Sequence, residues 1–113
     1  MKYDPGDVVF GDSPFNDREA PRPWVIVSDE THPFYGEQYI AVTPTSKSWY
    51  DQTVELTAKN WEYGGMPEES AVVPWGLTSP DHDDFNHDRY QGTLTSTTVK
   101  RITTAITEYF FTS

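Results

Sequence analysis

The sequence contains no cysteine, which excludes disulfide bonds and thiolate metal sites. It also lacks any apolar run near the ~20 residues that a membrane-spanning helix needs, and its start lacks the apolar segment of a signal peptide. Basic residues are few, because eight Lys and Arg stand against eighteen Asp and Glu, for a formal net charge of −10. We therefore expect a cytoplasmic protein, with a composition that fits a salt-adapted, halophilic cytoplasm.

Aromatic residues, in contrast, are plentiful. Trp, Tyr and Phe make up 15% of the chain, enough to sustain a core where a disordered segment could not. At 113 residues the chain is long enough for one modest core and too short for two. We predict a single domain that spans residues 1–113.

Short apolar or alternating runs, separated by Gly, Pro and polar clusters, predict antiparallel strands. The predicted strand Ser70–Trp75 should be interrupted at Pro74, because proline cannot donate a hydrogen bond to a β-ladder. Segments Ala58–Glu69 and Asp81–Arg89 are interpreted as irregular loops. The predicted strands are Val8–Phe10, Trp24–Val27, Tyr39–Val42, Gln52–Thr57, Ser70–Trp75 and Tyr90–Leu94.

The C-terminal segment changes period. Apolar residues recur there at spacings of three and four, which predicts an amphipathic helix over about Ser96–Phe110. Thr95 is the expected N-cap, with Leu94 and Val99 as a hydrophobic staple across it. No helix separates the early strands, so we predict a mainly β fold: a small barrel of five to six strands with one terminal helix.

A candidate phosphate site lies at the ends of two neighbouring predicted strands. Arg22 begins one strand, and Thr45 and Ser46 follow the other. If the strands pair, a guanidinium lies beside two hydroxyls, and its planar fork binds oxyanions in bidentate fashion. The alternatives are a surface ion pair of Arg22 with Asp17 or Glu19, and turn capping by the two hydroxyls. Trp24, inside a continuous apolar run, is expected in the core.

Four stretches together resemble the PemK/MazF family of toxin endoribonucleases. They are Gly6-Asp7-Val8-Val9, Arg22-Pro23 followed by Trp-Val-Ile-Val-Ser, Val42-Thr-Pro-Thr45-Ser46, and Gly92-Thr-Leu-Thr. These stretches span nearly the whole chain in the family's order. The resemblance implies an SH3-like small barrel of the CcdB/PemK/MazF type, a homodimer, and cleavage of single-stranded RNA with no metal or other cofactor. The implied partners are single-stranded RNA and a small antitoxin protein.

The resemblance also implies roles for particular residues. Arg22 and Thr45 match the family's catalytic arginine and threonine, with Ser46 beside them. The chain departs from the family at Pro74–Thr78, where a polar segment with glutamine and basic or acidic residues is usual. Two hypotheses therefore remain: a metal-independent, sequence-selective endoribonuclease that acts as a toxin, or a non-catalytic barrel that binds a protein or nucleic acid.

Further candidates lie on predicted loops. His32 is a candidate acid–base group because its unperturbed pKa is about 6.5. The acidic segment Asp81–Asp88 carries metal-ligand types but no calcium-loop spacing, so a solvated surface is the favoured interpretation over a cation site. The full set of candidates outside the catalytic positions comprises His32, Asp17 and Glu19 for acid–base work and Lys47, Phe34, Tyr35 and Trp49 for substrate binding.

Overall fold

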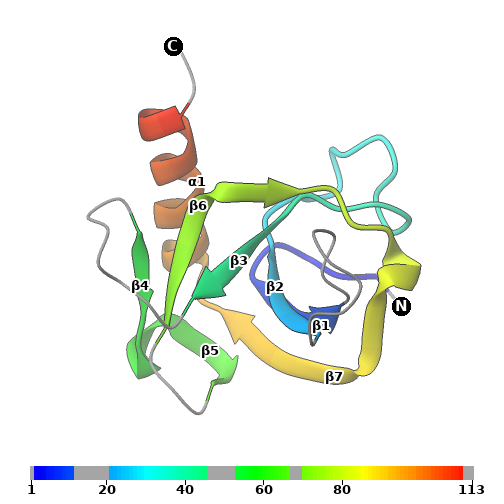
Figure 1. The fold of residues 1–113 in the computed structure, drawn as a ribbon, viewed down its shortest axis with the longest axis horizontal. Coiled ribbons are helices and arrows are strands. Elements are labelled where there is room, and N and C mark those ends of the chain that lie inside the picture. The colour runs from blue at the N-terminus through cyan, green and yellow to red at the C-terminus, as the bar shows by residue number, and fades with distance from the viewer. Residues whose placement is uncertain (1, 12–20, 46–52, 67–69, 111–113) are drawn as a thin grey trace.

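One curled antiparallel sheet and one C-terminal helix make up the fold of the computed structural model, which describes residues 2–11, 21–45, 53–66 and 70–110 (Figure 1). Within these residues the sheet has seven strands in the order β4-β6-β3-β2-β1-β7-β5. The predicted class, mainly β with a terminal helix, is confirmed. The elements are β1 (Asp7–Gly11), β2 (Arg22–Ile26), β3 (Ala41–Thr45), β4 (Val54–Leu56), η1 (Ala58–Asn60), β5 (Trp61–Gly64), β6 (Ser70–Thr78), η2 (His82–Asp84), β7 (Phe85–Leu94) and α1 (Ser96–Phe110).

Helix α1 has the predicted bounds and the predicted cap. The Thr95 hydroxyl accepts a hydrogen bond from the backbone N–H of Thr98 at 3.2 Å, and the Thr95 carbonyl accepts one from Val99 at 3.0 Å. The apolar stripe of the helix buries Ile102, Ala105 and Ile106. Threonine has low helix propensity, so packing of this stripe on β4 and β6 is what holds the helix in place.

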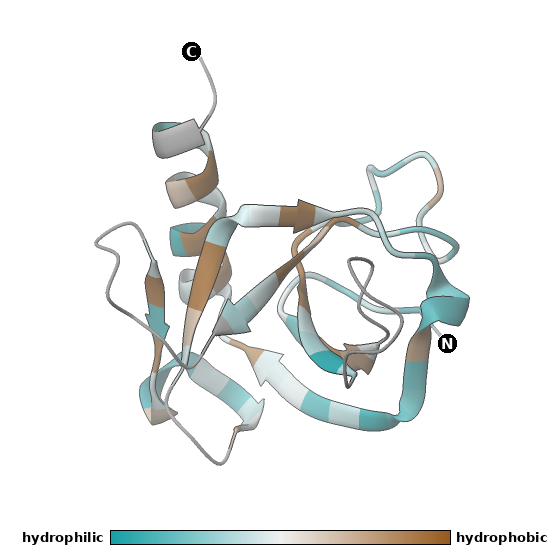
Figure 2. Cartoon of the chain, viewed as in Figure 1, coloured by the Kyte–Doolittle hydropathy of each residue, from teal (hydrophilic) through white to brown (hydrophobic). Residues whose placement is uncertain are grey.

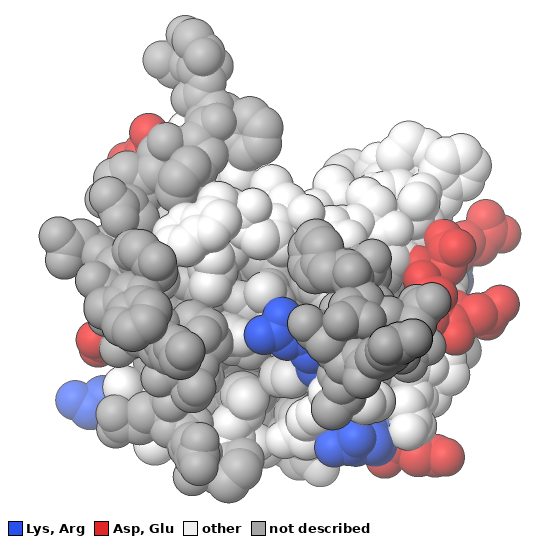
Figure 3. Space-filling model, in the orientation of Figure 1, with Lys and Arg blue, Asp and Glu red and all other residues white. Residues whose placement is uncertain are grey.

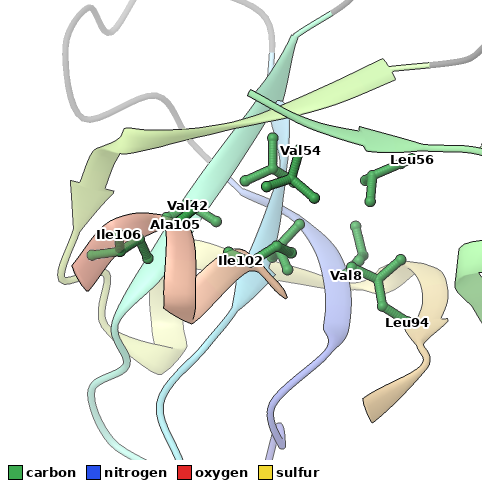
Figure 4. Packing of buried hydrophobic residues seen from close by; sticks show 10 residues of the cluster. Val8, Val42, Val54, Leu56, Leu94, Ile102, Ala105 and Ile106 are labelled. Atoms are coloured by element: carbon green, nitrogen blue, oxygen red, sulfur yellow. The ribbon is translucent and has the colours of Figure 1, made fainter. Parts of the chain in front are cut away.

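The central strands send alternate side chains to two separate cores, as strand geometry requires. On β1 and β2, Val8 and Val25 face the helix, whereas Val9 and Trp24 face the other way. Trp24 is 1% exposed, so its predicted core position is confirmed. The first core, which we call the aliphatic cluster (Figure 4), consists of Val8, Val25, Val42, Val54, Leu56, Val72, Leu94, Ile102, Ala105 and Ile106. The second, the aromatic cluster, consists of Tyr3, Val9, Trp24, Ile26, Tyr39, Ala41 and Phe85.

The prediction of an irregular loop over Ala58–Glu69 is wrong for part of that segment. Residues Trp61–Gly64 form strand β5, which pairs with β7 at Trp61↔Leu94 and Gly64↔Gly92. The described residues therefore contain seven strands, where five to six were predicted. A Cβ on Gly64 would lie 2.2 Å from the Gln91 carbonyl oxygen, and one on Gly92 would lie 2.2 Å from that of Tyr63. The glycines permit a close approach of two backbones here. Because glycine pairs are also typical of loops, the sequence pattern predicted a loop instead of a strand.

Strand β7 begins at Phe85, earlier than the predicted Tyr90. It pairs with β1 at Val9↔Tyr90 and Gly11↔Phe85, with shifts in register between the pairs. The side chains of residues 86–89 are all exposed. Figure 2 shows that this stretch of β7 is hydrophilic, whereas the middle strands and the inner face of α1 carry apolar residues. Because these residues bury no side chain, the sequence carries no apolar signal for this part of the strand.

Strand β6 continues through Pro74, so proline does not end it. The pairs Thr43↔Val73 and Ala41↔Thr78 enclose residues 74–77 on β6 but only Val42 on β3. The expected interruption is therefore a bulge within a continuous strand, where a missing N–H donor is tolerated. Strand β3 itself is displaced from the predicted Tyr39–Val42 and runs over Ala41–Thr45.

Candidate functional site

Arg22 is the first residue of β2 and is partly buried. Its partner across the sheet is Gly11 of β1. Since side chains alternate along a strand, Arg22 lies on the same face as Trp24 and Ile26, the face of the aromatic cluster. A Cβ on Gly11 would lie 3.3 Å from Trp24 Cδ1 and 2.9 Å from Phe85 Cδ1. The rings of Trp24 and Phe85 thus pack closely against Gly11, the residue that pairs with Arg22.

No carboxylate in the described ranges forms an ion pair with Arg22. Asp17 and Glu19, the partners considered from the sequence, lie outside those ranges. Figure 3 shows Lys and Arg side chains near the middle and the lower edge of the face in view, whereas Asp and Glu gather along the rim where β6 turns into β7. The exposed carboxylates at that turn are Glu37, Asp81, Asp83 and Asp84.

Strands β2 and β3 are neighbours, as predicted, but they separate toward the candidate site. Their pairing covers Val25↔Val42 and Ile26↔Ala41. Thr45, the last residue of β3, pairs instead with Ala71 of β6. In Figure 1 the start of β2 and the end of β3 lie apart at the same end of the sheet. The structure therefore places Arg22 and Thr45 at one end of the sheet without setting them side by side, and Ser46 and Lys47 lie outside the described residues.

The loop between β2 and β3 carries the other predicted groups, at the opposite end of β2 from Arg22. His32 Nδ1 accepts a hydrogen bond from the Phe34 backbone N–H at 2.9 Å, and the ring packs against the exposed Phe34. The five residues of β2 span roughly 13 Å. The structure therefore does not bring His32 or Phe34 to Arg22.

Tyr35, on the same loop, is tied to the N-terminal segment. Its hydroxyl donates a hydrogen bond to Asp4 Oδ1 at 2.5 Å, and the Lys2 ammonium lies 5.0 Å from its ring centroid. The hydrogen bond to Asp4 raises the pKa of Tyr35 to about 12. The last predicted substrate-binding residue, Trp49, lies outside the described residues.

A cluster of two histidines and two tyrosines was missed by the sequence analysis. The rings of His82 and His87 stack with centroids 4.4 Å apart. Tyr39 Oη and His82 Nδ1 are hydrogen-bonded at 2.9 Å, and Tyr3 Oη is hydrogen-bonded to His87 Nδ1. Burial lowers the pKa of His82, as does the neighbouring His87. Burial raises the pKa of both Tyr3 and Tyr39. These four residues come from distant segments, so no local pattern announces them.

The acidic segment after β6 forms a short capped turn. Asp84 Oδ2 accepts a hydrogen bond from the Asp81 backbone N–H at 2.8 Å. Beside it lies a recess of about 320 Å³, lined by Gly36, Glu37, Asp81, His82, Asp83 and Asp84. Among the described residues, no group of three or more His, Asp or Glu side chains is arranged to hold a metal ion.

The fold defines a class: a small half-barrel of antiparallel strands, closed on one side by a C-terminal helix. Solved structures share this architecture. An endoribonuclease from a mycobacterial species superposes with a TM-score of 0.71 at 20% identity, over 94% of this chain and 88% of that chain. A mycobacterial endoribonuclease in complex with its cognate antitoxin gives 0.69 at 21% identity, over 93% and 89%.

A third similar chain comes from a MazE–MazF crystal structure of Deinococcus radiodurans, with a TM-score of 0.68 at 16% identity over 94% of this chain and 92% of that one. No protein-family model and no curated protein matches the sequence. The chain has the fold of the MazF-type toxins, as the sequence motifs predict. In the described part of the chain, no helix has the length and apolar character to cross a membrane.

Proposed function

We propose that this protein is the toxin of a toxin–antitoxin pair, a sequence-selective endoribonuclease that cleaves single-stranded RNA without a metal ion. The observation that carries the proposal is the match to endoribonuclease structures over about nine-tenths of both chains. The arginine that the sequence motif assigns to catalysis supports it, because Arg22 is partly buried on the aromatic face with no ion-pair partner in the described ranges. We infer that the protein acts as a homodimer in the cytoplasm.

In this mechanism the RNA supplies its own nucleophile. The 2′-hydroxyl attacks the adjacent phosphorus, the 5′-oxygen leaves, and the products carry a 2′,3′-cyclic phosphate and a 5′-hydroxyl. The Arg22 guanidinium donates hydrogen bonds to the non-bridging oxygens and stabilises the charge of the pentacoordinate phosphorane. Thr45 and Ser46, from the other strand end, orient the phosphate.

The general base that removes the 2′-hydroxyl proton is one of the three acid–base candidates predicted from the sequence: His32, Asp17 or Glu19. His32 lies at the far end of β2, and its Nδ1 is occupied by the Phe34 N–H. Asp17 and Glu19 precede Arg22 by five and three residues in the chain. One of these two carboxylates is therefore our preferred base, with His32 as the alternative. Lys47 and Trp49, which follow Ser46 in the chain, contribute to substrate binding in this proposal.

The partner that restrains the toxin is a small antitoxin protein whose disordered arm covers the surface beside Arg22. One of the similar structures is an endoribonuclease bound to its antitoxin. The net charge of −10 opposes RNA binding at low salt. At molar salt the Debye length is about 3 Å, so only charges in contact act on the RNA. We therefore expect activity to require high salt.

A second candidate function is a non-catalytic barrel that binds RNA or a protein. It is favoured by residues 74–78, which contain no acid, base or glutamine and present Trp75 with 44% of its surface exposed. Either function uses Arg22 for binding. Only the first requires it for bond cleavage.

The decisive experiment replaces Arg22 and follows RNA cleavage in molar salt. Arg22→Ala should lower the cleavage rate of single-stranded RNA by about 10²–10³-fold, because one preformed donor to the transition state is lost. Arg101→Ala is the matched control, since Arg101 is exposed on α1 and its loss changes the net charge equally. Chelator should leave the rate unchanged, and mass spectrometry should find 2′,3′-cyclic phosphate ends.

Two outcomes contradict the proposal in different ways. Wild-type protein that binds RNA through Arg22 but never cuts it would establish the non-catalytic function. Cleavage that proceeds equally in wild type, Arg22→Ala and Arg101→Ala would show that the active site lies elsewhere.

A further inference from the structure

The side chain of Tyr63 is the most exposed of the large hydrophobic residues in the described part of the chain, with 67% of its surface open to solvent. It stands on β5, at the edge of the sheet. Its ring stacks on that of Tyr90 of β7, with centroids 6.2 Å apart and planes at 23°. One ring face is therefore backed by a second aromatic ring, and most of the remaining surface is in water.

The backing ring is held in place by hydrogen bonds. The Tyr90 hydroxyl donates a hydrogen bond to Asp7 Oδ1 at 3.0 Å and lies against the Thr93 hydroxyl. Thr93 donates to the same carboxylate oxygen at 2.8 Å. This network fixes Tyr90, and the close pairing of Gly64 with Gly92 fixes β5 against β7. Because both rings stand on fixed backbone, a flat ligand that stacks on Tyr63 has little ordering cost to overcome.

The two tyrosines lie on the same face of the sheet as Arg22. Val9 pairs with Tyr90 on one side and with Trp24 on the other, and directly paired residues share a face. Arg22 shares that face because it is two residues from Trp24. Strands β5, β7, β1 and β2 are consecutive in the sheet. Three strand spacings of about 4.8 Å separate β5 from β2. Tyr63 pairs with Thr93, which pairs with Asp7, whereas Arg22 pairs with Gly11, four residues farther along β1. The platform therefore lies roughly 14 Å across the sheet and roughly 13 Å along it from Arg22.

The charges near the platform are compatible with a nucleic-acid chain. Asp7 is engaged by two hydroxyl donors. Glu62 neighbours Tyr63 on the strand, so alternation directs it to the opposite face. Exposed Arg89 precedes Tyr90, and its guanidinium lies 3.8 Å from the Phe10 ring centroid. By the same alternation Arg89, like Glu62, is directed to the face opposite the platform.

We propose that Tyr63, backed by Tyr90, is a stacking platform for one base of a single-stranded RNA whose scissile phosphate is held at Arg22. The inference rests on the proposed function for its substrate class. Every base offers a π-face, so the platform adds affinity with little sequence preference, typically 1–3 kcal/mol per stacked base. It fixes the position of a base a few nucleotides from the cleaved bond. This helps to determine which phosphodiester bond of the RNA is cut.

The test measures binding separately from cleavage. Single-stranded oligoribonucleotides in which every ribose is 2′-O-methylated cannot be cut, because the nucleophile is blocked. With a fluorescein label, their affinity for the wild type is measured in high salt by anisotropy. Tyr63→Ala should weaken binding by about 5- to 150-fold. Tyr63→Phe and Tyr63→Trp should keep wild-type affinity, because both retain the ring. Glu62→Ala, on the same strand but the opposite face, is the matched control.

An abasic scan then locates the contact. One abasic position in the oligonucleotide should weaken binding to the wild type and leave binding to Tyr63→Ala unchanged, since the stacked base is already without its partner. Urea unfolding midpoints equal to wild type show that the variants are folded.

The outcomes separate this inference from the proposed function. Loss of affinity in Tyr63→Ala together with a wild type that never cuts RNA upholds the platform and refutes the nuclease. Normal cleavage and unchanged RNA affinity in Tyr63→Ala refute the platform and leave the nuclease intact. A Tyr63→Ala variant that binds RNA normally but becomes monomeric in light scattering would assign the ring to contact between protein chains, which also overturns the inference.

Discussion

The two cores on opposite sides of the central strands are built from different chemistry. The aliphatic cluster contains only Val, Leu, Ile and Ala. The aromatic cluster contains Tyr3, Tyr39, Trp24 and Phe85, and its tyrosine hydroxyls are hydrogen-bonded to His82 and His87. The first holds the helix on the sheet. The second connects the floor beside Arg22 to titratable groups at the surface.

The difference shows which interactions stabilise each core. An aliphatic core is stabilised by the burial of apolar atoms, so the loss in free energy of unfolding on mutation scales with the number of atoms removed. This loss does not depend on pH, because the core has no titratable group. A core with buried hydroxyls also depends on the completeness of its hydrogen bonds, because an unpaired buried donor costs free energy. Removal of side-chain volume, of one hydrogen bond and of one titratable group tests this contrast in order of decreasing effect.

The largest effect should come from the aliphatic cluster. Ile102 of α1 is fully buried against the sheet, so Ile102→Ala should lower the free energy of unfolding by about 2–5 kcal/mol. Ile102→Val, which removes one methyl group, should cost only about 0.5–1.5 kcal/mol. Urea unfolding at constant salt measures both. Equal losses in the two variants would show that buried volume is not what anchors the helix.

A smaller effect is expected when one hydrogen-bonding atom leaves the aromatic cluster. The Tyr39 hydroxyl accepts a hydrogen bond from the buried backbone N–H of Tyr3 at 3.2 Å and is also bonded to His82. Tyr39→Phe keeps the ring and leaves that N–H without a partner, which should cost about 1–3 kcal/mol. The control is Tyr35→Phe, because the Tyr35 hydroxyl bonds at an exposed site. A Tyr39→Phe midpoint that does not move would mean that water replaces the lost acceptor.

The smallest effect should be a pH dependence. Burial and His87 lower the pKa of His82 in the folded state, with Asp83 acting in the opposite sense. Below the unfolded pKa of about 6.5, the unfolded chain therefore binds more protons at this position. The stability that neutral His82 contributes is complete above that value and is lost as pH falls toward the lower folded pKa.

Urea midpoints recorded from about pH 7.5 to about pH 5.5 measure this contribution. The wild type should lose stability over the window, and His82→Gln should lose less because its side chain does not titrate. The Ile102→Val variant, altered in the other core, should retain the full pH slope. A slope that is the same in wild type and His82→Gln would assign the pH response to other groups.

Local pattern was enough to predict the elements that bury a regular face. Strands β1 and β2 and helix α1 follow from their apolar periods and caps. Strand β5 was missed because Gly64 and Gly65 resemble a loop, whereas Gly64 serves to pair closely with Gly92. The start of β7 was missed because its exposed residues follow the pairing with β1, which no local signal encodes.

The candidate site was predicted one residue at a time and not as a geometry. The place of Arg22 at the start of β2 follows from its sequence. Its separation from Thr45 does not, because it depends on where β3 leaves β2 to pair with β6. The contact between Tyr63 and Tyr90 likewise exists only once β5 lies beside β7. Such arrangements are set by tertiary pairing, so a single sequence does not reveal them.

The bulge in β6 has a consequence for how this chain can change over evolutionary time. Residues 74–77 fall between the pairs that join β6 to β3, and the pairs with β4 end at Val72. Pro74 is buried and Leu77 packs against the aliphatic cluster, so Trp75 is the exposed position of the bulge. A different side chain at that position leaves the strand pairs on either side unchanged. This is the stretch in which the sequence departs from the polar pattern of the toxins it resembles. The chemical group displayed on the bulge can therefore differ between chains that keep the same pairing of β6 with β3 and β4.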